Sequence, residues 1–201
     1  MGVEIEVKLE FTPQELRRFR KWSVLKNITN GRPRRSCLRA CYYDTDDWDL
    51  VNQKSSLRIR REFGDWIQTY KLALPSSEIR RRIELNWTLK EPKLDFGLLV
   101  KDENARQASK GFENKKIVEI FYTRIWRTVR KIKYKNSEIE LAIDAGHIFA
   151  QDKKLEVSEV ELELICGEAD DLMELALCWQ QLFDFKIGGE SKAERGYKLA
   201  A

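Results

Sequence analysis

The chain has 201 residues, of which 42% are hydrophobic and 35% charged, enough apolar material for a single domain over residues 1–201. Its 37 basic and 33 acidic side chains leave a formal net charge of +4, a surplus too small to indicate nucleic-acid binding by itself. One histidine, His147, leaves little material for His-dependent triads or His-rich metal sites. Four cysteines without paired spacing and no apolar run of membrane-spanning length favour a cytoplasmic protein with reduced thiols and no membrane partner.

The first predicted elements are a strand and a helix. Residues 3–11 alternate apolar and charged side chains, which predicts a strand with one apolar and one charged face. Thr12 then suits a helix N-cap and Pro13 the first helical position, so a helix is expected to about Trp22. Residues 27–36 are interpreted as a loop from their composition.

Most of the remaining chain is predicted to be β-structure. Strands are expected over 38–44, 55–61, 66–74, 80–89, 117–135 with a break near Thr128, 138–149 and 155–165. The polar stretch 90–116 is expected to hold a short helix within a long excursion. An amphipathic helix begins near 167–171, and 191–197 forms a turn or short helix. The predicted class is therefore α+β, mainly antiparallel β.

At least six of these strands combine a polar face with an apolar face, and the sign of the charge differs between strands. The acidic strands carry Glu4 and Glu6, the alternate residues 138–144, and the alternate residues 159–163; the basic ones carry Arg58 and Arg60, Lys71, and Arg80 and Arg82. One geometry is a sheet with a solvated face. The other is a barrel with a polar interior and an apolar exterior covered by helices. The segregation of acidic from basic strands favours the barrel.

A barrel of this kind would place many carboxylates around one cavity. Carboxylates that share a cavity repel one another unless a cation lies among them, and all-oxygen ligation suits Mg²⁺ or Mn²⁺. Clustered Arg and Lys side chains need an anion of matching charge, and phosphate oxygens accept bidentate bonds from arginine. A triphosphate that bridges the metal and the guanidinium groups would satisfy both halves of the site.

The motif Glu4-x-Glu6-x-Lys8, three residues from the start, resembles the N-terminal signature of the CYTH superfamily, the triphosphate tunnel metalloenzymes. Its ordered companions span nearly the whole chain: Tyr43-Asp44-Thr45, Leu57-Arg58-Ile59-Arg60, Lys71, Arg82-Ile83-Glu84, Arg127, Ile143-Asp144, Glu159-Val160-Glu161-Leu162-Glu163 and Ser191-Lys192. Residues 161–165 and 191–197 are most similar to the catalytic domain of bacterial inorganic triphosphatases.

The resemblance implies an eight-stranded antiparallel closed β-barrel with helices packed outside and a divalent metal and a triphosphate inside. The metal ligands it implies are Glu4, Glu6, Asp144, Glu159, Glu161 and Glu163, and the choice among the last three stays open. Phosphate would be bound by Lys8, Arg58, Arg60, Lys71, Arg82, Arg127 and Lys192, with Glu84 positioning the basic groups. Arg124 is the alternative to Arg127. The implied catalytic residues are Glu4, Glu6, Lys8, Asp144 and Lys192.

The function we expect is metal-dependent hydrolysis of a linear triphosphate, first of all inorganic tripolyphosphate to pyrophosphate and phosphate, by a monomer or homodimer. The alternatives are other reactions of the same family, namely thiamine triphosphate hydrolysis, RNA 5′-triphosphate removal and the cyclisation of ATP by a class IV adenylate cyclase. A non-catalytic module that binds polyphosphate or nucleic acid is a further alternative. In that last alternative the basic strands and the basic segment 32–39 would bind the ligand, whereas the enzymatic alternatives assign no role to residues 32–35.

Overall fold

The computed structural model describes residues 2–62, 64–75, 79–103, 105–106 and 115–201. Within these residues nine strands form one sheet: β1 Gly2–Phe11, β2 Thr29–Thr45, β3 Ser55–Glu62, β4 Asp65–Ala73, β5 Arg80–Leu89, β6 Ile117–Tyr134, β7 Ser137–Ala150, β8 Lys153–Cys166 and β9 Phe185–Ile187. The described helices are α1 Pro13–Lys21, α2 Val24–Ile28, α3 Asp49–Asn52, α4 Phe96–Lys101, α6 Ala169–Gln180 and α7 Lys192–Ala200.

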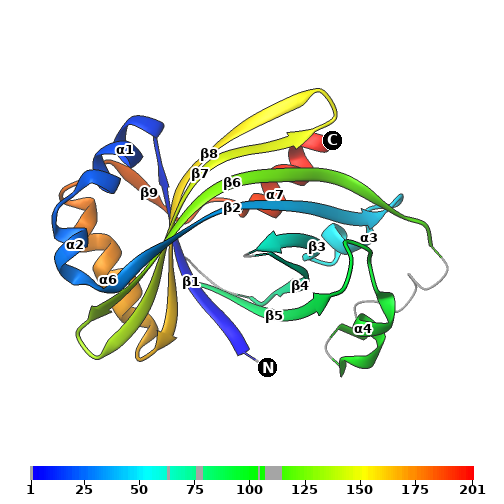
Figure 1. The fold of residues 1–201 in the computed structure, drawn as a ribbon, viewed down its shortest axis with the longest axis horizontal. Coiled ribbons are helices and arrows are strands. Elements are labelled where there is room, and N and C mark those ends of the chain that lie inside the picture. The colour runs from blue at the N-terminus through cyan, green and yellow to red at the C-terminus, as the bar shows by residue number, and fades with distance from the viewer. Residues whose placement is uncertain (1, 63, 76–78, 104, 107–114) are drawn as a thin grey trace.

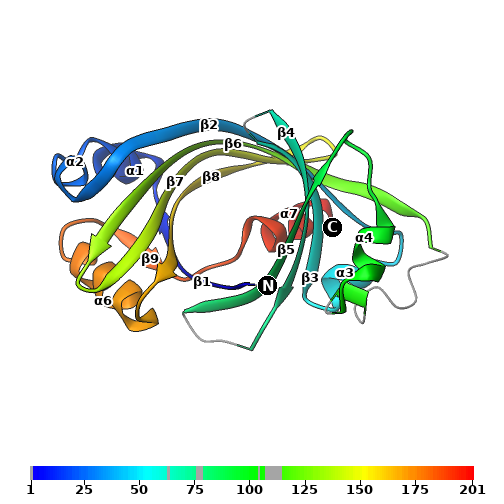
Figure 2. The same cartoon turned by 60° about the horizontal axis from the view of Figure 1, so that its bottom comes forward.

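The sheet closes on itself. Its strand order is β5-β4-β3-β2-β6-β7-β8-β1-β9, and an additional pairing joins β5 back to β1. The N-terminal half of β1, from Gly2 to Glu6, pairs with β5, while Leu9–Phe11 pairs on the same edge with the short strand β9. Every pairing in this circuit is antiparallel, so the predicted eight-stranded antiparallel barrel is confirmed (Figures 1 and 2).

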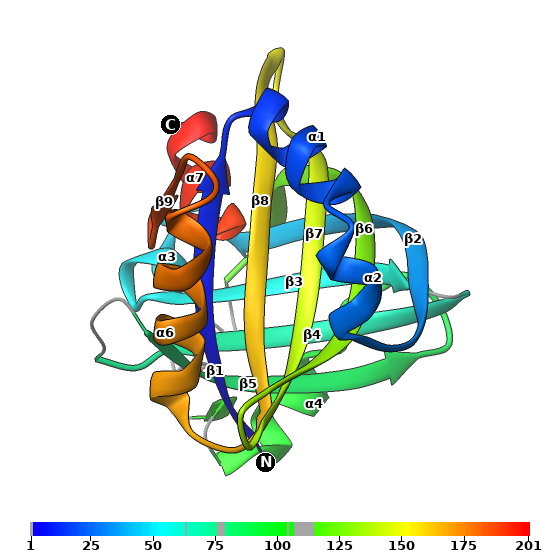
Figure 3. The same ribbon diagram turned by 90° about the vertical axis from the view of Figure 1, so that its left-hand side faces the viewer.

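Helices α1, α2 and α6 cover the outer face of β1, β8 and β7 (Figure 3). The apolar residues of the alternating strands point toward these helices: Val7, Leu141 and Leu162 belong to one buried cluster with Phe19 of α1 and Trp179 of α6. Because strand side chains alternate faces, the charged neighbours of these apolar residues are directed to the barrel interior. Burial of the outer face thereby fixes which side chains reach the cavity.

Helix α7 lies at one end of the barrel. Its Tyr197 shares a second buried cluster with Leu38, Ile125 and Ile148, and Leu38, Ile125 and Tyr197 also line the central cavity. The apolar contacts at this end are therefore on the inner face of the sheet. Gly196 permits the close approach, because a Cβ at this position would lie 2.1 Å from the ring of Phe121. Helices α3 and α4 contribute to a third cluster, with residues of β3, β4 and β5.

The interpretation of residues 27–36 as a loop is wrong. Helix α2 extends to Ile28 and β2 begins at Thr29. The Gly-Arg-Pro sequence occupies an irregularity in the β2–β6 pairing between Asn30 and Arg34, where Gly31 has φ +83°. The long strand β6 provides pairing partners on both sides of this irregularity, so the turn-like composition interrupts the register without ending the strand.

Some of the other predicted elements agree with the structure and some do not. The expected break near Thr128 is wrong, because β6 runs without interruption from Ile117 to Tyr134. Strand β9 and helix α3 were not predicted, and both are too short to give a periodic signal. The excursion over 90–116 contains the short helix α4 as expected, although part of it lies outside the described residues. Among the described helices, none combines the length and the hydropathy needed to cross a membrane.

Candidate functional site

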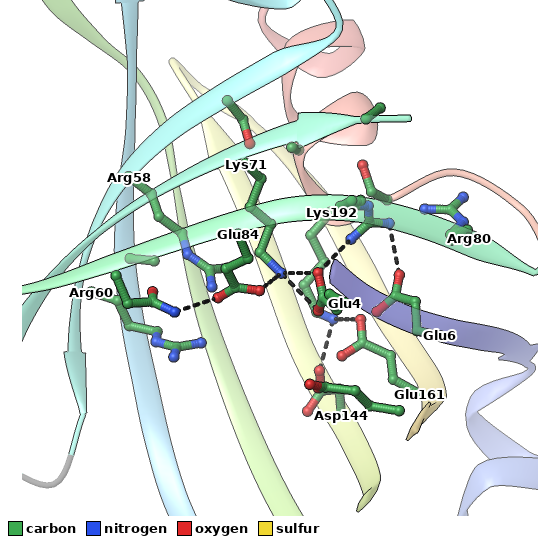
Figure 4. Close-up of a pocket in the computed structure, with 18 of the residues that line it drawn as sticks. Glu4, Glu6, Arg58, Arg60, Lys71, Arg80, Glu84, Asp144, Glu161 and Lys192 are labelled. Carbon is green, nitrogen blue, oxygen red and sulfur yellow. Dashed lines mark hydrogen bonds and ion pairs between the residues drawn. The ribbon is translucent and has the colours of Figure 1, made fainter. Parts of the chain in front are cut away.

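A cavity of about 1160 Å³ lies inside the barrel and is lined by charged side chains from the eight strands β1 to β8 and from α7 (Figure 4). The predicted site residues that line it are Glu4, Glu6, Arg58, Arg60, Lys71, Arg82, Glu84, Arg127, Asp144, Glu161, Glu163 and Lys192. Two predicted residues, Lys8 and Glu159, lie beside the cavity and do not line it. The sequence pattern therefore identified a set of residues that the fold brings together.

The first group of charges joins β1 to β4 and β5. The Lys71 ammonium donates to both carboxylate oxygens of Glu4, at 2.8 and 2.9 Å, and lies 2.6 Å from the Glu84 carboxylate. The guanidinium of Arg82 lies 2.7 Å from Glu6 and 3.9 Å from Glu4. This proximity follows from the barrel closure, since Glu4 and Arg82 are direct partners in the β1–β5 pairing. Figure 4 shows Lys71, Glu4 and Glu84 directed toward one another.

The second group joins β6, β7, β8 and α7. The guanidinium of Arg127 donates to both oxygens of Asp144, at 2.8 and 2.5 Å, and to Glu161 at 2.6 Å. The Lys192 ammonium lies 2.7 Å from Asp144 and 2.8 Å from Glu161, and it also contacts Glu159. Lys192 is the first residue of α7, whose capping box at Ser191 and Glu194 fixes where the helix begins. The cap thus positions a buried cation above three carboxylates.

Glu159 is completely buried and is held by three cations. Lys8 lies 3.1 Å from its carboxylate, and Lys192 and Arg195 also contact it. Lys8 is itself 1% exposed, pairs with Glu10 at 3.0 Å and donates to the backbone oxygen of Glu190. The geometry gives Lys8 the contacts of a residue that anchors α7 and the segment before it to the barrel wall.

Two arginines of β3 supply positive charge that the protein leaves partly unmatched. Arg58 donates to the Tyr42 hydroxyl at 3.2 Å, and Arg60 lies 2.5 Å from Glu62. The Nε atoms of both arginines are buried without a hydrogen-bond partner among the described residues. Burial and the nearby Arg58 lower the pKa of Arg60 to about 10. A buried donor without an acceptor is unfavourable, so this wall of the cavity is suited to an anion.

The carboxylates differ in how well their charge is compensated. Burial tends to raise the pKa of Asp144 and of Glu161, but Arg127 and Lys192 hold both pKa values below their ordinary range. Burial raises the pKa of Glu4, to which Glu6 and Glu84 also contribute. The pKa of Glu163 rises to about 7, through burial and then through the charge of Glu4. The Glu4 and Glu163 region therefore has surplus negative charge that a cation would stabilise.

The donor set fits a hard divalent cation. Asp144, Glu159 and Glu161 each offer a carboxylate oxygen, and these oxygens lie within 4.8 Å of one another. The Lys192 ammonium touches all three, which shows that this cluster binds positive charge. Glu6 and Glu163, direct partners in the β1–β8 pairing, offer further oxygens beside it. Oxygen ligands of this kind suit Mg²⁺ or Mn²⁺.

Two residues that contact the candidate site were missed from the sequence. Tyr42 and Arg195, which bind Arg58 and Glu159, were not among the predicted site residues. Arg195 follows Lys192 at the i+3 spacing of one helix face, which is a signal that was available. Tyr42 follows Leu38 and Ala40 on an apolar face of β2 and gave no such signal. The alternative Arg124 is exposed and pairs with His147 in the sheet, so Arg127 is the arginine that reaches the cavity.

Comparisons with known proteins give concordant results. The model of the CYTH domain family matches residues 2–197. An inorganic triphosphatase of Haemophilus influenzae is 30% identical over 203 residues, covering 98% of this chain and 55% of the relative. The chain therefore spans about half the length of that curated relative.

Solved structures share the fold at low sequence identity. A proposed adenylyl cyclase from Hippeastrum with a dominant triphosphatase activity superposes with a TM-score of 0.68 at 16% identity, covering 97% of this chain and 95% of its own. A proposed adenylate cyclase from Bacillus halodurans gives a TM-score of 0.61 at 20% identity, covering 97% and 98%. With the family model matching almost every residue, this chain belongs to the CYTH domain family.

Proposed function

We propose that the protein hydrolyses a linear triphosphate inside the barrel in a reaction that depends on Mg²⁺ or Mn²⁺, with inorganic tripolyphosphate as the substrate. The observation that carries this proposal is the presence, around one cavity, of a carboxylate cluster and of two guanidinium groups whose buried Nε atoms have no acceptor among the described residues. Such a cavity complements a ligand that is strongly anionic and also binds metal. The similarity to an inorganic triphosphatase supports the choice of tripolyphosphate.

The chain's own residues would bind and orient the substrate. Arg58 and Arg60 can donate to phosphate oxygens through the Nε atoms that lack partners, and Lys71, Arg82 and Arg127 lie on the surrounding walls. Each of these last three now neutralises a tunnel carboxylate. A triphosphate would share these cations with the carboxylates, and its phosphate groups would be aligned by these basic side chains. Positioning and charge compensation are the main protein contributions to phosphoryl transfer.

The metal would be held by the carboxylates that are already assembled. Asp144, Glu159 and Glu161 form one set, and Glu163 of β8 and Glu4 and Glu6 of the neighbouring β1 lie beside it. A bound divalent cation neutralises phosphate oxygens and polarises a water molecule. In the reaction, water adds to the terminal phosphorus, the bridging P–O bond breaks, and pyrophosphate leaves. A tunnel carboxylate accepts the proton of the water and passes it to solvent.

The direct test is phosphate release from tripolyphosphate in Mg²⁺, in Mn²⁺ and in EDTA, by the unchanged protein and by Glu6→Gln. We expect release only with metal and a loss of at least about a hundredfold in Glu6→Gln, since the variant removes a tunnel charge without changing side-chain size. Release that continues in EDTA, or a fully active Glu6→Gln, would contradict the proposal. Thiamine triphosphate, a 5′-triphosphorylated RNA and ATP serve as competing substrates in the same assay, with cyclic AMP measured for ATP.

A further inference from the structure

Basic side chains line the inner face of the barrel beyond the site described above. They lie on β2 and β6 and form a row that begins at Arg127. Ser36 of β2 pairs with Arg127 of β6, and Arg34 pairs with Val129. Arg34 and Arg127 both line the cavity, so they are diagonal neighbours on one face, with Cβ atoms roughly 7–8 Å apart by general strand geometry. Arg34 is thus the next cation along the wall after the proposed phosphate ligand Arg127.

Lys131 continues the same row. It follows Val129 at a spacing of two residues on β6, which puts it on the same face of the strand, and its direct partner on β7 is Glu140, another lining residue. Lys131 is exposed, and the side chain of Arg34 is 58% exposed with its guanidinium 3.8 Å from Glu140. Along this wall the cations therefore become more exposed, from the 16% exposed side chain of Arg127 to the exposed Arg34 and Lys131, as expected at the mouth of a tunnel.

The irregularity in β2 adds charge at this mouth. Residues 31–33 stand opposite Arg130 alone in the β2–β6 pairing, and Arg32 within this bulge is exposed. Exposed cations gathered at one mouth of a tunnel attract a polyanion.

The opposite end of the cavity has a different character. The aromatic residues among those that line it, Tyr42 and Tyr197, are almost fully buried in the apolar cluster at α7. A nucleobase leaving the tunnel at the cationic mouth would find guanidinium, ammonium and carboxylate groups there and no lining aromatic ring to stack on. The chemistry of this mouth thus favours a ligand that remains phosphate along its whole length.

We propose that Arg34 and Lys131, assisted by Arg32 of the bulge, bind the phosphates beyond the third in a linear polyphosphate whose first three phosphates occupy the tunnel. This inference rests on the proposed function, because the tunnel must accept the end of the chain. It gives the basic segment at the start of β2 a role: the protein binds longer polyphosphate chains more tightly than tripolyphosphate.

The test is isothermal titration in EDTA, where no metal supports turnover, with tripolyphosphate and with a size-fractionated linear polyphosphate several times longer. We expect the unchanged protein to bind the longer chain roughly five- to tenfold more tightly per molecule, and the double variant Arg34→Gln/Lys131→Gln to bind both with equal affinity. The double variant should also lower the slope of log affinity against log salt by about 1.4 for the longer chain.

The matched control is Arg39→Gln/Arg124→Gln. These two exposed arginines are direct partners on the same two strands but lie on the outer face of the barrel, so the control removes the same charge and should keep the length preference. Equal or weaker binding of the longer chain by the unchanged protein, no binding of it, or equal losses in both double variants would overturn the inference. Tighter binding of a 5′-triphosphorylated RNA than of polyphosphate would also overturn it. Tripolyphosphate hydrolysis in Mg²⁺ is scored separately, so failure of the proposed function is distinguishable.

Discussion

Strands β7 and β8 bury their outer face in one half of their length and their inner face in the other half. In the half that carries Leu141 and Leu162, the outer face is the core beneath α1 and α6, and the inner face carries Asp144 and Glu161. In the half near α7, Ile148 and its neighbours on the inner face form the core with Tyr197, and the outer face is partly solvated. The same pair of strands thus lines the charged cavity in one half and packs against α7 through apolar residues in the other.

The difference shows that strand parity alone does not say which face is the core. Parity is preserved along β7, with no register shift against β8 between Ile139 and Ala150; what changes is the partner that covers the strand. Where helices cover the outside, polar side chains are left to fill the interior, and where α7 enters from the end, apolar residues must face inward to receive it. Substitutions in the charged half should therefore reduce activity, and substitutions in the apolar half should reduce the free energy of unfolding.

The largest effect is expected on activity in the charged half. Glu161→Gln removes the carboxylate that receives Arg127 and Lys192, and should reduce tripolyphosphate turnover by at least about a hundredfold, roughly 2.7 kcal/mol in the activation barrier. The control is Glu156→Gln, an exposed position on the outer face of the same strand, which should leave turnover unchanged. Initial rates of phosphate release measure the turnover of both variants. Equal rates in the two variants would contradict the assignment of the charged half to the reaction.

The next effect is on stability in the apolar half. Tyr197 is 3% exposed and packs on the rings of Phe121 and Trp48, so Tyr197→Ala should lower the free energy of unfolding by about 3–5 kcal/mol. Leu177→Ala, at an exposed position of α6, should change it by less than about 0.5 kcal/mol. Urea unfolding followed by tryptophan fluorescence gives both values. Similar losses in both variants would show that the α7 end is not a packed core.

A smaller loss is expected where the two halves of β7 meet. A Cβ at Gly146 would lie 2.1 Å from the backbone oxygen of Arg124 on β6, and backbone atoms cannot rotate away as a side chain can. Gly146→Ala should therefore cost about 1–3 kcal/mol of stability. The midpoint of urea unfolding should fall while its denaturant slope stays constant. An unchanged midpoint would mean that β6 and β7 separate freely at this position.

The smallest effect concerns pH. Because the pKa of Glu163 is raised to about 7 in the folded protein, from 4.5, the folded state binds this proton more tightly than the unfolded state. Its contribution to stability is present below pH 4.5 and is lost as the pH rises through 7. In EDTA, Glu163→Gln should therefore raise the melting temperature relative to the unchanged protein above pH 7 and leave it nearly equal below pH 4.5. A difference that is constant with pH would contradict the burial of this charge.

The sequence was most informative where periodicity and chemistry coincide. The Glu4-x-Glu6 alternation placed two carboxylates on the inner face of β1, and the closed barrel places Arg82 of β5 beside them. Alternation is a local property, so it predicts the face that a side chain shares with its neighbours. Combined with the family resemblance, it also predicted the closed barrel.

Contacts between distant segments account for what was missed. The pairing of residues 29–36 with β6 overrode a turn-like composition, and Arg195 acquires its role through Glu159, 36 residues earlier in the chain. The anchoring position of Lys8 depends on the backbone of Glu190, at the other end of the sequence. None of these contacts leaves a local period or motif that would reveal the partner.

The most direct test of the reaction chamber is the position of bound metal and phosphate. Crystals soaked in Mn²⁺ and tripolyphosphate would be measured at the manganese absorption edge. The account predicts anomalous density beside Asp144, Glu161 or the Glu4 and Glu6 pair, with phosphate density in the cavity against Arg58 and Arg60. Ordered Mn²⁺ and phosphate outside the barrel, with an empty cavity, would contradict it.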